Sequence, residues 1–90
     1  MLEVGALDKT KVGEVEHYYG HLGVAVINVV GTLKVGDKIL FENKLGQPVL
    51  EQIVTSMQIA QNKIEEAKPG QAIGLKVGDK VHQGNVVYKV

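Results

Sequence analysis

Two histidines, two tyrosines and a carboxylate follow one another in the segment Glu16-His-Tyr-Tyr-Gly-His21. Imidazole and carboxylate groups are common ligands of divalent metal ions, so a set that converged could hold one. Successive residues of a strand point to opposite faces, however, and Glu16 and His17 need a bend between them to share a site. His17 and His21 lie on either side of a turn, which permits convergence without imposing it. We expect no metal ion here.

The two tyrosines of this segment offer a different chemistry. Tyr18 and Tyr19 could stack on a base or anchor a protein contact, because tyrosine combines a large apolar face with a polar tip. Alternation along a strand places one of them in the core. The simplest alternative is a hairpin whose aromatic rings cover one end of the core. We therefore take His17, Tyr18, Tyr19 and His21 as candidate partner-binding residues.

Catalytic chemistry has little support elsewhere. Ser56 is the only serine and falls within an expected strand, without the sharp turn that exposes a nucleophile. His82 lies in a polar loop, where solvation explains it. No Gly-x-x-x-x-Gly-Lys-Ser/Thr loop occurs, and the segment 70–76 has the wrong spacing for one. We expect neither catalysis nor a cofactor.

The charge balance argues against recruitment to RNA by bulk electrostatics. Ten lysines oppose ten acidic residues, and arginine is absent. Arginine makes the bidentate contacts to phosphate and guanine, and nucleic-acid-binding domains usually carry a basic surplus. The neutral net charge still allows a local basic patch, because folding could bring Lys34, Lys38 and Lys76 together. These three lysines are further candidates for partner binding.

Length and composition indicate one small domain over residues 1–90, with residues 1–10 as a flexible lead-in. The apolar fraction of 44% is mostly Val, Ile and Leu, which favours a β-rich core. There is no cysteine, and an acidic residue stands at position 3, where a signal peptide would carry basic charge. The longest apolar run has strand length, so we expect a cytoplasmic protein.

Short apolar runs bounded by glycine turns predict the strands. The expected strands cover 12–19, 24–30, 37–42, 49–59, 72–77 and 86–90. The second is apolar on both faces and therefore central, Gly36 is expected at positive φ, and 68–71 fits a type II turn. Residues 62–67 allow one helical turn at most. The pattern predicts an all-β fold, a small closed antiparallel barrel of about six strands.

One hexapeptide, Leu-Lys-Val-Gly-Asp-Lys, occurs at 33–38 and again at 75–80. Duplication is one explanation. The other is that both places meet the same need: a strand, a glycine turn, an aspartate bonded to nearby backbone, then a second strand. We favour this second explanation.

Two motifs give the chain a specific resemblance over about residues 10–90. The first is a Gly-x-Leu-x-x-Gly-Asp-x-Ile segment, and the second is a Glu-Ala-x-x-Gly turn followed by a Gly-Leu strand. They are filled by Gly31, Leu33, Gly36, Asp37 and Ile39, and by Glu66, Ala67, Gly70, Gly74 and Leu75. In this the chain resembles domain II of the translation elongation and initiation factor GTPases, such as elongation factor Tu, here as a free-standing small protein. The matched residues are scaffold residues.

The resemblance implies a translation-factor type of β-barrel and a binding role. In that family, domain II helps to dock tRNA acceptor ends or ribosomal RNA. We therefore expect a monomeric, non-catalytic binding module. Its partner would be the ribosome, contacted through ribosomal RNA, or else tRNA or a translation factor. Related barrels are attached to collagenase-like peptidases. The alternative is thus a protein–protein accessory domain that partners such an enzyme and has no RNA role.

Overall fold

The computed structural model describes residues 9–90, and every regular element in that range is a β-strand. The strands are β1 (Thr10–Tyr19), β2 (Val24–Val29), β3 (Leu33–Lys34), β4 (Lys38–Glu42), β5 (Pro48–Ile53), β6 (Met57–Ile59), β7 (Asn62–Ile64), β8 (Glu66–Ala67), β9 (Ala72–Lys76) and β10 (Val86–Lys89). The all-β prediction is confirmed, but about six strands was too low a count. Of the expected lead-in at 1–10, residues 1–8 lie outside the described residues, and Thr10 already begins β1.

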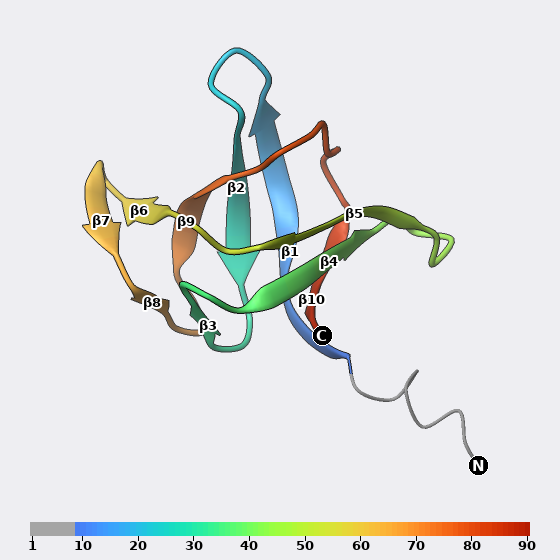
Figure 1. The fold of residues 1–90 in the computed structure, drawn as a ribbon, viewed down its shortest axis with the longest axis horizontal. Helices are drawn as coiled ribbons and strands as arrows, with labels where there is room; N and C mark the ends of the chain where they lie inside the picture. The colour runs from blue at the N-terminus through green and yellow to red at the C-terminus, as the bar shows by residue number, and fades with distance from the viewer. Residues whose placement is uncertain (1–8) are drawn as a thin grey trace.

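Eight strands form one antiparallel sheet in the order β5-β4-β10-β1-β2-β9-β6-β7, and β3 pairs separately with β8. Since β5 and β7 end the sheet, the closed barrel that we expected is not found in residues 9–90. The residues that follow these two end strands both bond to the β3–β4 connection. Val35 N–H donates to the Glu65 carbonyl (3.0 Å), and Gly36 N–H donates to the Val54 carbonyl (2.8 Å). The strands therefore wrap around one interior without a continuous ladder (Figure 1).

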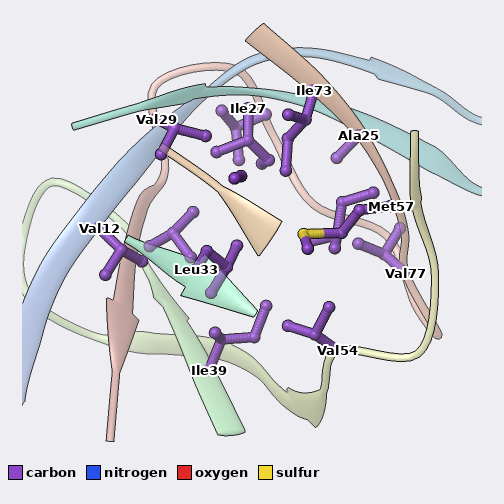
Figure 2. Packing of buried hydrophobic residues seen from close by; sticks show 14 of the residues in the cluster. Val12, Ala25, Ile27, Val29, Leu33, Ile39, Val54, Met57, Ile73 and Val77 are labelled. Carbon is purple, nitrogen blue, oxygen red and sulfur yellow. The ribbon is translucent and has the colours of Figure 1, made fainter. Parts of the chain in front are cut away.

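The interior is aliphatic, as the composition predicted, with Phe41 as its aromatic member. Figure 2 shows side chains from β1, β2, β3, β4 and β9 pointing toward one another, together with Val54 and Met57. Burial of such side chains is the main source of stability in a domain of this size. In the part of the chain described, no helix has the length and apolar character that crossing a membrane requires.

β2 is central, because it lies between β1 and β9 in the sheet. Its residues alternate, with Ala25, Ile27 and Val29 buried in the core. Asn28 is exposed and the remaining residues of the strand are half-buried. The prediction of a central strand is confirmed, but only one of its faces is fully covered.

The expected long strand over 49–59 was wrong. The chain forms β5, leaves strand geometry at 54–56 and resumes as β6. Val54 N–H donates to the Asp37 carbonyl (2.8 Å), and its side chain is 1% exposed, whereas Ile53 is 47% exposed. The break resets the alternation of faces, so Ile53 does not share a buried face with Met57.

The possible helical turn at 62–67 was also wrong, because these residues form β7 and β8. β6 and β7 make a hairpin across Ala60 and Gln61, which have positive φ values of 51° and 69°. The turn at 68–71 agrees with the prediction. Gly70 has a φ of 92°, and Gln71 N–H donates to the Lys68 carbonyl (3.2 Å).

The scaffold residues occupy positions that explain their types. Leu33, Ile39, Ala67 and Leu75 are fully buried. Gly36 has the expected positive φ, and Asp37 accepts a hydrogen bond from the Lys34 amide. Gly31 lies against the Lys11 carbonyl, and Gly74 faces the side chains of Val24 and Gln58. Glu66 is exposed and lies opposite Lys34 in the antiparallel pairing of β3 with β8.

Gly13 carries a packing role that the sequence did not reveal. A Cβ at this position would lie 2.7 Å from the Asn28 carbonyl oxygen and from a methyl group of Ile27. The register of β1 against β10 shifts between Lys11 and Gly13, so this stretch contains a bulge. A glycine in a bulge lets two strands approach more closely than a side chain permits.

Candidate partner-binding surface

The hairpin of β1 and β2 projects beyond the core and ends in the turn Gly20–Gly23 (Figure 1). Both Leu22 N–H (3.1 Å) and Gly23 N–H (2.9 Å) donate to the Tyr19 carbonyl, which closes the turn tightly. Lys76, the last residue of β9, pairs with Val24 beside this turn. The tip therefore combines residues that are distant in the sequence.

A bulge in β1 decides which side chains face outward. The register against β2 shifts between Val15 and His17, and Glu16 is the extra residue. This is the bend that Glu16 and His17 needed to point away from the core together, and both are exposed. Tyr18 then packs against the core, as alternation requires of one tyrosine.

His17 and Tyr19 lie on the same face of β1 and contact each other. Their ring centroids are 4.4 Å apart at an angle of 63°, an edge-to-face arrangement. Tyr19 is 48% exposed. His21, in the turn itself, is exposed as well. Of the four hairpin candidates, three thus face solvent and one, Tyr18, contributes to packing.

Leu22 is the residue of the tip that sequence reasoning missed. Its side chain is 63% exposed in the middle of the turn. The signal was present, because a leucine between two glycines of a short turn has no strand face on which to be buried. Its position makes it the most prominent apolar group of the hairpin end.

The three candidate lysines are not brought together. Lys76 Nζ lies 3.5 Å from the Leu22 carbonyl oxygen, at the hairpin tip. Lys34, on β3, and Lys38, at the start of β4, flank the β3–β4 turn at the end of the fold away from the tip (Figure 1). Lys38 is moreover paired with Glu51 at 2.7 Å. Only Lys76 can act with the hairpin residues.

Metal-ligating side chains do not gather at the tip. No group of three or more His, Cys, Asp or Glu residues in 9–90 is arranged to hold a metal ion. The side chains with shifted pKa values lie near the start of β1 instead. There the hydrogen bond from Lys11 lowers the pKa of Glu14, and the hydrogen bond to Glu42 raises the pKa of Lys9.

Two surface hollows border the segment between β5 and β6. The first, about 380 Å³, is lined by Gln52, Ile53, Thr55, Lys76, Val77 and Gly78. The Gln52 amide spans it, donating to the Lys76 carbonyl and accepting from Gly78 N–H, both at 2.8 Å. The second, about 190 Å³, is lined by Val35, residues 55–57 and residues 63–65. Ser56 lies here, and no histidine stands in either lining.

No family model matches the chain. It is 39% identical over 80 residues to Uncharacterized protease MJ0090 of Methanocaldococcus jannaschii, a match that covers 89% of this chain. The chain spans only 19% of the length of that protein. The similarity therefore concerns one part of a much larger polypeptide.

Solved structures share the fold. The C-terminal domain of a protein described as a U32 peptidase, from Geobacillus thermoleovorans, superposes with a TM-score of 0.81 at 21% identity. That match covers 89% of this chain and 99% of the domain. GDP-bound aIF5B from Aeropyrum pernix matches with a TM-score of 0.60 at 15% identity, over 96% of this chain and 16% of that protein. The predicted likeness to translation factors thus holds at the level of the fold, and the peptidase domain is the nearer of these two in shape.

Proposed function

We propose that the chain is a non-catalytic accessory module of a U32 peptidase-type protein. The observation that carries the proposal is the 39% identity to the M. jannaschii protease, which spans most of this chain. The corresponding part of that protein is about a fifth of its length, which leaves the remainder to supply an active site. The agreement in shape with a peptidase's C-terminal domain supports the same assignment.

The chemistry of the described residues is in keeping with a binding role. Ser56 lines a hollow without a histidine, and the residues of the hairpin tip face solvent. A nucleophile needs a base within hydrogen-bond reach, and a metal-dependent site needs converging ligands. We assign the module to the cytoplasm, as a monomer when separated from its enzyme.

Binding to RNA in a translation setting is the second candidate. The fold likeness to aIF5B over nearly the whole chain favours it, as do the solvent-facing His17 and Tyr19, which could meet a base. The balanced charge, the absence of arginine and the separation of Lys76 from Lys34 and Lys38 argue against it. We therefore rank ribosomal RNA, tRNA and translation factors below a peptidase partner.

A pull-down of the tagged chain from cell lysate separates the two candidates. It is carried out at low and at moderate salt, with and without RNase, and the bound proteins are identified by mass spectrometry. We expect a peptidase-type polypeptide that remains bound after RNase treatment and at moderate salt. Recovery of ribosomal RNA or tRNA, lost with RNase or salt, would instead establish the second candidate.

A further inference from the structure

The end of the β1–β2 hairpin presents a preformed contact surface, the tip surface, made of Tyr19, His21, Leu22 and Lys76. Its turn is held by two hydrogen bonds to the Tyr19 carbonyl, and Lys76 is placed beside it by pairing with β2. Leu22 and Tyr19 are 63% and 48% exposed. A rigid exposed apolar group loses little conformational entropy on binding, which favours its use in recognition.

Leu45 is the natural comparison, because it is 82% exposed in another turn. Its turn, residues 43–47, otherwise consists of Asn, Lys, Gly and Gln, so the turn itself contains no second apolar side chain. Leu22 is accompanied by a second exposed apolar residue, Tyr19, whose carbonyl accepts the Leu22 amide at the end of β1. The combination of an aliphatic and an aromatic side chain distinguishes the tip surface from a solitary exposed leucine.

The chemistry of the tip surface fits a protein better than a nucleic acid. Leucine neither stacks on bases nor bonds to phosphate, yet Leu22 is more exposed than Tyr19. The rings of His17 and Tyr19 contact each other edge to face, which leaves less free ring surface for a base. Apolar pockets that receive such side chains are typical of protein interfaces.

Lys76 specifies the charge of the partner. Four of the ten lysines in residues 9–90 form ion pairs, and Lys76 is one of the six that do not. Pairing with Val24 places it beside the tip. Its Nζ contacts only a carbonyl oxygen at 3.5 Å, beside Leu22. A partner surface with a carboxylate next to an apolar recess would complement this arrangement.

We propose that the tip surface docks on the catalytic part of a U32 peptidase-type polypeptide, with Leu22 in an apolar recess and an Asp or Glu of that part facing Lys76. This inference rests on the proposed function. The M. jannaschii relative leaves about four-fifths of its length outside the matched segment, so most of that polypeptide is available to supply such a surface.

The test is a chimera of the M. jannaschii protease in which its matched segment is replaced by the corresponding residues of this chain. Hydrogen exchange, read by mass spectrometry, compares peptides spanning 18–24 in the chimera and in the isolated chain. The turn amides of an exposed hairpin exchange through local opening, so docking slows them. We expect exchange at the tip to slow by about tenfold or more in the chimera, the slowing set by the free energy of docking.

Matched variants identify the side chains responsible. Leu22→Ser and Lys76→Glu in the chimera are expected to restore fast exchange at 18–24. Leu45→Ser and Lys44→Glu, a leucine and a lysine exposed in another turn, are expected to leave the protection unchanged. Circular dichroism of each variant checks that the fold is retained.

The alternative outcomes distinguish a failure of the docking surface from a failure of the proposed function. Protection of other surfaces of the module, with the tip still exchanging freely, would overturn the docking surface and leave the proposed function intact. No protection anywhere on the module would overturn both. Protection of 18–24 in the isolated chain by added tRNA, with none in the chimera, would overturn both in favour of RNA.

Discussion

The hexapeptide Leu-Lys-Val-Gly-Asp-Lys adopts two different structures in the same molecule. At 33–38 it turns the chain: Gly36 has a φ of 99°, and Asp37 accepts the Lys34 amide at 2.8 Å. At 75–80 it ends β9: Gly78 is outside the positive-φ region, its N–H donates to Gln52, and no strand follows at once. Our expectation that both copies meet the same need holds for the strand at the leucine and lysine and for the aspartate, since Asp79 also accepts a backbone N–H, from Lys80 at 2.7 Å. It was wrong for the glycine turn and for the second strand.

The backbone hydrogen-bond partners of each hexapeptide copy account for the difference. In the first, Gly36 N–H is drawn to the Val54 carbonyl, which bends the chain toward β4. In the second, Val77 N–H bonds to the Gly23 carbonyl of the hairpin one residue past the end of β9, and the Val77 side chain is buried. Six identical residues therefore do not determine their own conformation. The neighbouring segments select it, as tertiary contacts commonly override local preference.

The largest effect is expected where the copies agree. Leu33 and Leu75 are both 0% exposed and belong to one core. Leu33→Ala and Leu75→Ala should each lower the free energy of unfolding by about 3 kcal/mol, through lost burial and the cavity left behind. Urea denaturation measures both. A difference of more than about 2 kcal/mol between them would contradict an equivalent role.

Substitution of the valine in each hexapeptide should affect stability differently in the two copies. Val77 is 6% exposed and Val35 is 43% exposed. Val77→Ala is expected to cost about 2 kcal/mol, and Val35→Ala less than about 0.5 kcal/mol. The midpoints of urea denaturation of the two variants give the comparison directly. Equal costs would mean that Val77 is not better buried than Val35 in solution.

The glycines provide a smaller contrast of the same kind. Gly36→Ala should cost about 1 kcal/mol, because a Cβ is disfavoured at its positive φ even though the space is open. Gly78→Ala should be neutral within about 0.5 kcal/mol, since its Cβ would meet Gln52 at an ordinary distance. Thermal unfolding followed by circular dichroism resolves the difference, and a greater loss for Gly78→Ala would reverse the comparison.

A small effect is also predicted for the side chain that holds the second copy in place. Gln52→Met removes both hydrogen bonds to the backbone of 76–78 and should cost about 1 kcal/mol or less, because water can reach this surface. Faster hydrogen exchange of the Gly78 amide is the more sensitive measurement. The control is Gln58→Met, an exposed position of β6. Unchanged exchange at Gly78 would show that Gln52 does not anchor this segment.

Much of the fold was accessible from local patterns. Glycine turns and β-branched runs located β1, β2, β4 and β10 closely, and Gly36 and Gly70 were assigned their conformations correctly. The errors fall at 54–56 and 62–67, where the chain bonds to distant residues. A carbonyl far along the chain, such as that of Asp37 for Val54, leaves no trace in a local window.

The candidate surface shows the same division. The hairpin and its outward histidines and tyrosine could be inferred from alternation and the Gly20 turn. The bulge at Glu16, which turns Glu16 and His17 outward together, could not, because one inserted residue is a property of two paired strands. The placement of Lys76 next to Leu22 depends likewise on the pairing of β9 with β2.

By itself, the sequence determined an all-β domain with an aliphatic core, a balanced charge, and the positions of its tight turns. These properties follow from residue type and short spacing, which act within a few residues. Only the tertiary structure decided that the sheet stays open between β5 and β7, that the glycine of one hexapeptide has a positive φ while that of its copy does not, and that Lys76 joins the hairpin tip. Each of these depends on hydrogen bonds and packing between segments far apart in the chain, whose combined free energy exceeds the preferences of the local sequence.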